Sequence, residues 1–132
     1  MSHLCVGALI LDGQRILLGL RAAHKSYPHR WDIPGGHVEC GETLDQALIR
    51  ELQEELDITP VRWTHDARHM QGDTELHLFR VTAWSGTPRL CGDEHDELRW
   101  CHLSEAASLP NLAAAEYSDI FRALLAKPDP RT

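Results

Sequence analysis

Residues 35–58 read GGHVECGETLDQALIRELQEELDI, a glycine-containing loop that leads into a segment rich in carboxylates. Three of these carboxylates, Glu51, Glu54 and Glu55, follow the spacing i, i+3, i+4, which gathers side chains on one side of a helix. Like charges placed in this way repel one another and destabilise the helix unless something neutralises them. A divalent cation is the simplest candidate, because Mg²⁺ prefers carboxylate oxygens as ligands.

The same segment carries an apolar stripe, which predicts a helix with one buried face. The leucines of the stripe recur at helical spacing: Leu44, Leu48, Leu52 and Leu56. Thr43 is the expected N-cap. At about 100° per residue, Glu55 projects into the apolar arc, whereas Glu51 and Glu54 lie along its edge. A solvated acidic face with Arg50 paired to Glu54 is the simpler interpretation, but it leaves Glu55 unexplained because an unpaired buried carboxylate is costly.

The length and charge of the chain narrow the classes of function. Its 132 residues fit one domain, residues 1–132, in which residues 127–132 form a frayed tail. Acidic residues outnumber basic ones 20 to 13, for a net charge of −7, and no Lys/Arg cluster marks a nucleic-acid surface. We therefore expect a small-molecule ligand and no nucleic-acid polymer. If that ligand carries phosphates, cations must offset the carboxylates.

The sequence also bears on the cellular compartment. The apolar run 4–11 is too short to span a membrane and lacks the basic region and cleavage site of a signal peptide. The four cysteines show no paired spacing: Cys5, Cys40, Cys91 and Cys101. They predict free thiols in a reducing cytoplasm more than a framework of disulfides. Because the apolar run is short, we expect no membrane partner. A zinc site combining Cys91 and Cys101 with nearby histidines is an alternative, but Cys101 and His102 would face opposite sides of a strand.

The remaining segments predict a mixed sheet between helices, an α/β fold. Residues 4–11 and 15–21 are apolar at nearly every position and are joined by a hairpin turn at residues 12–14, which predicts central strands covered on both faces. Residues 22–30 form an exposed loop, residues 31–33 a short strand, and regular pairing should stop at residues 34–36. Strands follow at 61–70 and 74–83, with a bulge in the second, where the apolar phase shifts.

The C-terminal third predicts three further elements. An acidic loop at residues 92–97 precedes a strand at residues 98–103. Ser104 and Glu105 are expected to cap a short helical turn, and residues 113–126 carry helical spacing.

Residues 36–58 resemble the signature of the Nudix hydrolases. That signature places a glycine, a glutamate and Arg-Glu-U-x-Glu-Glu-x-Gly-U at fixed spacing, where U is bulky and apolar. Its positions are filled here by Gly36, Glu42, Arg50, Glu51, Leu52, Glu54, Glu55 and Ile58. Asp57 replaces the second glycine; because Asp enters the left-handed conformation at modest cost, we expect an effect on stability without loss of chemistry. Arg21-Ala22-Ala23, Pro34-Gly35-Gly36 and Glu94 extend the likeness to MutT-like nucleoside triphosphate pyrophosphohydrolases.

The resemblance implies an α/β/α sandwich and assigns roles to particular residues. The implied ligands of Mg²⁺, with Mn²⁺ as a possible substitute, are the Gly35 carbonyl, Glu51, Glu54, Glu55 and Glu94. Glu97 is a rival of Glu94. The implied catalytic residues are Glu51, Glu54, Arg50 and Glu94, where Arg50 orients the glutamates, in one interpretation through Glu42. The implied substrate contacts are Arg21, Trp31, Ile33 and His37, although Trp31 and Ile33 equally suit a sheet core.

The implied reaction is hydrolysis of a nucleoside or deoxynucleoside triphosphate to the monophosphate and pyrophosphate. ADP-ribose or a nucleotide sugar is the alternative substrate, and a non-catalytic nucleotide sensor is the alternative class of function. Glu116 occupies the position of an asparagine in MutT-like guanine readers, which argues against a preference for oxidised guanine. His24, Lys25, His29 and Arg30 either bind phosphates or are merely solvated. A monomer and a homodimer both fit the sequence.

Overall fold

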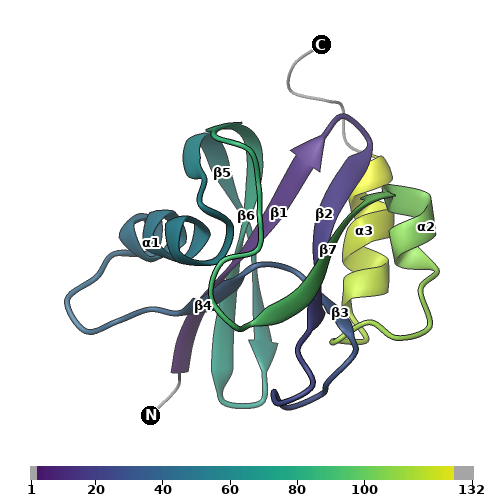
Figure 1. Cartoon of the computed structure of the whole chain (residues 1–132), viewed down its shortest axis with the longest axis horizontal. Coiled ribbons are helices and arrows are strands. Elements are labelled where there is room, and N and C mark those ends of the chain that lie inside the picture. The colour runs from purple at the N-terminus through teal and green to yellow at the C-terminus, as the bar shows by residue number, and fades with distance from the viewer. Residues whose placement is uncertain (1–2, 127–132) are drawn as a thin grey trace. The chain divides into compact units, whose positions relative to one another are not determined.

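The computed structural model describes residues 3–126; the predicted tail at residues 127–132 lies outside the described residues. Two units emerge, each assembled from two stretches of the chain (Figure 1). The first contains residues up to Ile10 together with Ile33–Gly92, and the second contains Leu11–Asp32 together with the residues from Asp93 onward. Strand β1 (His3–Asp12) contributes residues to both units.

The first unit contains a mixed sheet. Within it, β1 pairs in parallel with β6 (Thr74–Ser85) and antiparallel with β4 (Gly35–His37). Strand β6 also pairs antiparallel with β5 (Thr59–Gln71), and the two long strands lie side by side in Figure 1. The predicted strands at 61–70 and 74–83 are therefore confirmed, and both extend beyond the predicted bounds.

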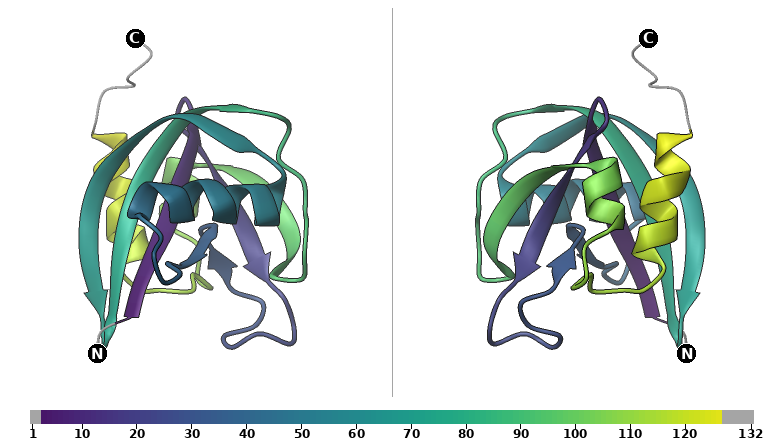
Figure 2. Two further views of the ribbon diagram at one scale, coloured as in Figure 1. Left: turned by 90° about the vertical axis from the view of Figure 1, so that its left-hand side faces the viewer. Right: turned by 90° about the vertical axis from the view of Figure 1, so that its right-hand side faces the viewer.

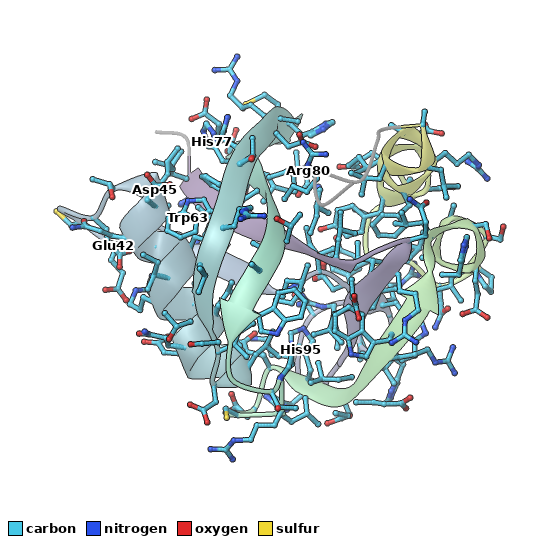
Figure 3. The ribbon with its side chains drawn as sticks, turned by 90° about the horizontal axis from the view of Figure 1, so that it is seen from above. Glu42, Asp45, Trp63, His77, Arg80 and His95 are labelled. Atoms are coloured by element: carbon cyan, nitrogen blue, oxygen red, sulfur yellow. The ribbon has the colours of Figure 1, made fainter. Side chains whose placement is uncertain are left out.

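Helix α1 (Leu44–Leu56) contacts β4 and β5 of the same unit. Of the four predicted stripe leucines, Leu48, Leu52 and Leu56 are fully buried, whereas Leu44 is only half-buried. Each fully buried leucine contributes roughly 1.5–3 kcal/mol, which holds the helix against the sheet. On the β5 side, Trp63 Nε1 donates to Asp45 Oδ1 across 2.9 Å, and Figure 3 shows these two side chains beside each other.

The ends of α1 are defined by local contacts. The predicted N-cap at Thr43 is confirmed: its hydroxyl accepts from the Gln46 N–H at 3.1 Å, while Gln46 Oε1 accepts from the Thr43 N–H at 2.9 Å. At the other end Asp57 adopts φ 55° and ψ 40°, which confirms the left-handed conformation expected there.

The prediction that regular pairing stops at residues 34–36 is wrong. Residues Gly35–His37 form β4, which pairs with Cys5–Gly7 of β1. Gly35 has φ 154°, and a Cβ at that position would lie 2.1 Å from the carbonyl oxygen of Val6. Only glycine permits this approach, so the residue that suggested a break is the one that lets the strand pair.

The bulge predicted in the second long strand is confirmed, because Arg62 pairs with Ala83 and Trp63 with Val81, which leaves Thr82 as an extra residue in β6. A second irregularity lies on the neighbouring strand. His65 pairs with Phe79 and Ala67 pairs with Leu78, so Asp66 is an extra residue in β5 opposite the phase shift of β6. The change of buried face between Leu78 and Phe79 is therefore real, because both are buried. At this point the extra residue lies on the partner strand.

The second unit begins with the predicted hairpin, which is confirmed. The end of β1 pairs with β2 (Arg15–Arg21) through Leu11 and Ile16, around a turn in which Gly13 has φ 62°. Strand β2 also pairs antiparallel with β3 (Trp31–Asp32) and β7 (His95–His102). Helices α2 (Leu103–Ala107) and α3 (Tyr117–Leu125) contact each other, and the right-hand view of Figure 2 shows them side by side.

Three boundaries in the second unit differ from prediction. Strand β7 starts at His95, inside the predicted acidic loop, because its pairing with β2 begins at Arg21. The N-cap of α2 is His102, whose side chain accepts from the Ser104 N–H at 3.1 Å, so Ser104 and Glu105 lie inside the helix. Helix α3 starts at Tyr117 rather than at residue 113.

Backbone pairing explains the late start of α3. The Trp31 N–H donates to Asn111 at 2.8 Å, and the Ala113 N–H donates to the Trp31 carbonyl at 2.8 Å. These bonds hold residues 111–113 beside β3, where a helix cannot form. The helical spacing of the sequence extends across this segment, but the tertiary pairing overrides it.

Two sequence predictions concern the whole described chain. All four cysteines are free, as their spacing predicted. Within residues 3–126, no helix is long and apolar enough to cross a membrane.

Candidate active site

Arg50 lies at the centre of the acidic cluster on α1. Its Nε and Nη2 donate to the two carboxylate oxygens of Glu42 at 2.6 and 3.0 Å, a bidentate pair. Its Nη1 donates to Glu51 at 2.9 Å and to Glu54 at 3.2 Å, and its Nη2 also donates to the His37 carbonyl at 2.9 Å. The predicted orienting role of Arg50 therefore has a geometric basis, which includes the expected contact with Glu42.

The pKa values of this cluster reflect its charges. The hydrogen bond from Arg50, with a second from the Glu39 N–H, lowers the pKa of Glu42 below its ordinary value. The same contact with Glu42 raises the pKa of Arg50. Burial raises the pKa of Glu51, and the neighbouring charge of Glu54 raises it further, although Arg50 acts in the opposite direction. One arginine thus does not neutralise all of the negative charge gathered here.

The carboxylate of Glu51 occupies space that a side chain at position 36 would fill. A Cβ built on Gly36 would lie 2.5 Å from Glu51 Oε1 and 2.8 Å from its Oε2. The side chain of Glu51 is only 14% exposed, so it has little room to withdraw. Because Gly36 has no side chain, the Glu51 carboxylate can lie against the β4 backbone.

Glu55 points inward, as predicted from the helical angle. It is 5% exposed, and its Oε2 accepts a hydrogen bond of 3.0 Å from the Gly35 N–H. A buried carboxylate is tolerated only when it is paired in this way. Glu54, in contrast, is 60% exposed and reaches Arg50 from the solvent side.

The chemistry of these groups suits a hard divalent cation. The oxygen atoms that could coordinate a metal ion are those of the glutamate carboxylates and of a backbone carbonyl in β4. The two glycines of β4 let that carbonyl approach a ligand closely. Within the described part of the chain, no three His, Cys, Asp or Glu side chains are already grouped as a metal centre. Instead, Arg50 holds Glu51 and Glu54. A bound cation would relieve the repulsion from Glu54, which adds to burial in raising the pKa of Glu51.

In the second unit, Arg21 organises the loop of residues 22–30. Its Nη1 pairs with Asp32 at 3.0 Å, and its Nε donates to the Ser26 carbonyl at 2.7 Å. The backbone of the loop is unusual, because Tyr27 and His29 have φ values of 51° and 59°. The predicted substrate contact is therefore already engaged with its own loop.

Glu94 is paired with the same loop. Lys25 Nζ lies 3.1 Å from Glu94 Oε2, and the Glu94 carbonyl accepts from the Ala22 N–H at 3.1 Å. The Glu94 side chain is 44% exposed. Its rival Glu97 is exposed and lies within β7, opposite Leu20 of β2.

The other predicted substrate contacts occupy different environments. Trp31 and Ile33 are each 6% exposed, and the Arg99 guanidinium lies 5.0 Å from the centre of the Trp31 ring. Ile33 packs against Gly7 within the first unit. His37 is exposed, with its Nδ1 lying 3.1 Å from the sulfur of Cys5.

A family model described as NUDIX domain matches residues 1–124. The chain belongs to the Nudix family. It is 37% identical to the CTP pyrophosphohydrolase of Escherichia coli (strain K12) over 84% of this chain and 83% of that relative. It is 32% identical to the 8-oxo-dGTP diphosphatase of the same organism, over 76% of this chain and 80% of that relative. This Nudix chain is accordingly a hydrolase of phosphorus-containing acid anhydrides.

Solved structures give the same family and confirm the predicted fold class. The MutT NUDIX hydrolase of Burkholderia pseudomallei matches with a TM-score of 0.78 and 29% identity, covering 92% of this chain and 97% of that one. The solution structure of the E. coli ORF135 protein matches with a TM-score of 0.75 and 32% identity, covering 94% and 89% of the two chains. The α/β class with a mixed sheet and helices is therefore confirmed.

Sequence reasoning missed several partners in this Nudix chain. Gln46 completes the cap of α1, and the Thr-x-x-Gln pattern at its N-terminus was an available signal. Lys25, which pairs with Glu94, lies in the polar loop of residues 22–30, and Asp32, which pairs with Arg21, lies in the short strand at residues 31–33. Neither belongs to a recognisable motif. Only the folded loop reveals those two pairs.

Proposed function

We propose that this Nudix chain is a Mg²⁺-dependent pyrophosphohydrolase that converts a nucleoside or deoxynucleoside triphosphate into the monophosphate and pyrophosphate. The observation that carries the proposal is the arrangement around Arg50, which holds three glutamates of the Nudix signature, Glu42, Glu51 and Glu54. A non-catalytic sensor is expected to lose glutamates of the signature, and this chain keeps all of them. The named relatives support the reaction, since each acts on a nucleoside triphosphate by its name.

We assign the ion to Glu51, Glu54, Glu55 and the Gly35 carbonyl, with Glu94 as an additional ligand. When bound, Mg²⁺ neutralises phosphate charge and makes water a better nucleophile. Arg50 keeps Glu51 and Glu54 in place, and Gly36 leaves room for the Glu51 carboxylate. Glu51 or Glu54 accepts the proton of the attacking water. Most of the rate enhancement comes from positioning and electrostatics.

The substrate contacts belong to this proposal as well. Arg21 and His37 are polar candidates for the phosphates and sugar, while Trp31 and Ile33 are apolar candidates for the base. The two relatives act, by name, on a pyrimidine nucleotide and on an oxidised purine nucleotide, so the base differs between them. Because Glu116 replaces the asparagine of guanine readers, we favour an unoxidised base.

The decisive experiment is Glu54→Gln, assayed with Mg²⁺ against triphosphates, oxidised nucleotides, ADP-ribose and nucleotide sugars. Glu105→Gln, which changes another exposed glutamate in the same way, is the control. We expect pyrophosphate release from a triphosphate by the wild type and the control, and a loss of at least about a hundredfold in Glu54→Gln. Wild-type turnover of Glu54→Gln would refute the assignment, and turnover of nucleotide sugars alone would replace the substrate class.

We also propose a cytoplasmic location, because the four free thiols persist in a reducing compartment. The partner is a small nucleotide, with neither a nucleic-acid polymer nor a membrane involved. The chain acts as one domain, and light scattering would decide between a monomer and a homodimer.

A further inference from the structure

The second unit contains a hollow that the proposed reaction does not use. Its volume is about 530 Å³, which falls within the range of ligand pockets, roughly 300–1,000 Å³. It lies between the residue that precedes β3, the segment that follows α2, and one side of α3. Arg30 and Arg122 line it, together with Ser108, Ser118, Leu109 and Pro110.

The charge of this hollow is opposite to that of the protein. The chain carries a net charge of −7, yet none of the described residues that line the hollow is acidic and two are arginines. Among residues 3–126, Arg122 forms one long contact, to Asp119, at 3.5 Å between exposed side chains. Arg30 donates to the Leu112 carbonyl at 3.4 Å. Contacts among the described residues therefore leave most of the guanidinium N–H groups available to an anion.

The walls of the hollow are tied together. Asn111 Nδ2 donates to the His29 carbonyl at 3.0 Å, next to Arg30. The Ser118 hydroxyl donates to the Ala107 carbonyl at 2.6 Å, which joins α3 to the end of α2. The segments that carry the two arginines are thus held in place before any ligand arrives, which reduces the entropy cost of binding.

The serine and apolar residues of the lining indicate the chemistry of the uncharged part of a ligand that binds here. The hydroxyl groups of Ser108 and Ser118 donate to backbone carbonyls, so each keeps its oxygen as an acceptor. Leu109 and Pro110 add an apolar wall. A ligand that matches these groups carries an anion for the arginines, a hydroxyl group for the serines and a partly apolar body.

We propose that this hollow binds a small phosphate ester with a hydroxyl-bearing body, either a sugar phosphate or a nucleoside monophosphate. Arginine suits phosphate because its planar fork donates two parallel hydrogen bonds. The site requires none of the carboxylates of α1. Binding therefore occurs without a divalent ion, a condition under which the α1 carboxylates repel phosphate.

Calorimetric titration of the metal-free protein in EDTA tests this site. The probes are ribose 5-phosphate, adenosine monophosphate and inorganic phosphate, and amide chemical shifts locate the binding. The variants are Arg122→Gln, Arg30→Gln and Ala115→Glu, which places a negative charge at an exposed position of the lining. Arg68→Gln is the matched control, because Arg68 is 62% exposed and paired with Glu75, whereas Arg122 is 58% exposed and paired with Asp119.

We expect one of the two esters to bind saturably, with shifts in residues 107–122 and an affinity reduced at least about tenfold in each of the three variants but unchanged in Arg68→Gln. Arg122→Gln should retain wild-type hydrolysis with Mg²⁺, so failure of this site is distinguishable from failure of the proposed reaction. Equal binding of inorganic phosphate and both esters would indicate an adventitious ion only and overturn the proposal. Absence of saturable ester binding, or binding that survives all three substitutions in folded variants, would overturn it as well.

Discussion

The backbone N–H of Gly35 donates a hydrogen bond of 3.0 Å to Oε2 of Glu55. This bond joins two secondary-structure elements, the glycine-containing strand β4 and the acidic face of α1. It also accounts for a carboxylate that is only 5% exposed. The N–H of Gly35 thus donates to the Glu55 carboxylate, and the carbonyl of the same residue is the group that we assign to the metal ion.

Substitution of Glu55 separates its structural role from its role toward the ion. In Glu55→Gln the amide oxygen still accepts from Gly35, so the free energy of unfolding should fall by less than about 1 kcal/mol. In Glu55→Ala the Gly35 N–H loses this acceptor, and the cost should be about 1–3 kcal/mol. Urea unfolding in EDTA measures both, and both variants should lose Mg²⁺-dependent turnover. Wild-type turnover in Glu55→Gln would show that Glu55 is not a metal ligand.

Gly36→Ala should weaken Mg²⁺ binding without a matching loss of stability. The new methyl group would meet Glu51 Oε1 at 2.5 Å, and the carboxylate must move. We expect at least about a tenfold loss of Mg²⁺ affinity by calorimetry. Gly7→Ala is the control: its methyl group would lie 2.7 Å from Ile33 Cδ1, so it should cost about 1–3 kcal/mol of stability and leave Mg²⁺ affinity unchanged. The opposite pattern would contradict the role given to Gly36.

The contact between Glu42 and Arg50 predicts a pH-dependent contribution to stability. Because the pKa of Glu42 is lowered in the folded state, its stabilisation is present above the unfolded pKa, about 4.3, and is lost as the pH falls through the folded value. Glu42→Gln should therefore melt below the wild type at neutral pH, and the two melting temperatures should converge in acid. Calorimetric scans between about pH 3 and 7 measure this. A difference in melting temperature that does not change with pH would contradict the prediction.

Asp57→Gly should stabilise the chain by about 0.5–1 kcal/mol, because glycine adopts φ 55° with less strain than aspartate. The substitution also removes the contact of Asp57 with Arg89 at 3.0 Å, but both side chains are exposed, so that loss is small. Asp57→Asn removes the charge and keeps tolerance of the left-handed conformation, which makes it the matched control. Unchanged melting with severalfold higher turnover would show that this position affects the chemistry instead.

Lys25→Met tests whether Glu94 serves the ion. Lys25 lies 3.1 Å from Glu94 Oε2 and competes with a cation for that carboxylate. Lys25→Met should therefore raise Mg²⁺ affinity severalfold, Lys25→Arg should leave it close to wild type, and Glu94→Gln should lower it. The readout is calorimetric titration of the metal into the protein. If Glu94→Gln does not change the affinity, Glu94 is not a ligand, and Glu97→Gln tests its rival.

Local sequence patterns predicted much of the acidic site. Helical spacing predicted the inward direction of Glu55, and glycine's conformational needs predicted the left-handed end of α1 at Asp57. These features depend on neighbours within one or two turns, and therefore on short-range geometry. Position 35 shows the limit of such reasoning, because a glycine reads equally as a break in a strand and as a place for close backbone approach.

The sequence by itself determined the chemistry of this protein: a Nudix signature, an acidic helix and an arginine within reach of its glutamates. Only the tertiary structure decided which groups pair with them. The pairing of Lys25 with Glu94 joins residues far apart in the chain, and Trp31 holds residues 111–113 out of α3. The Gly35 bond to Glu55 likewise depends on β4 lying beside β1. These contacts depend on chain packing across long sequence separations, which no local propensity encodes.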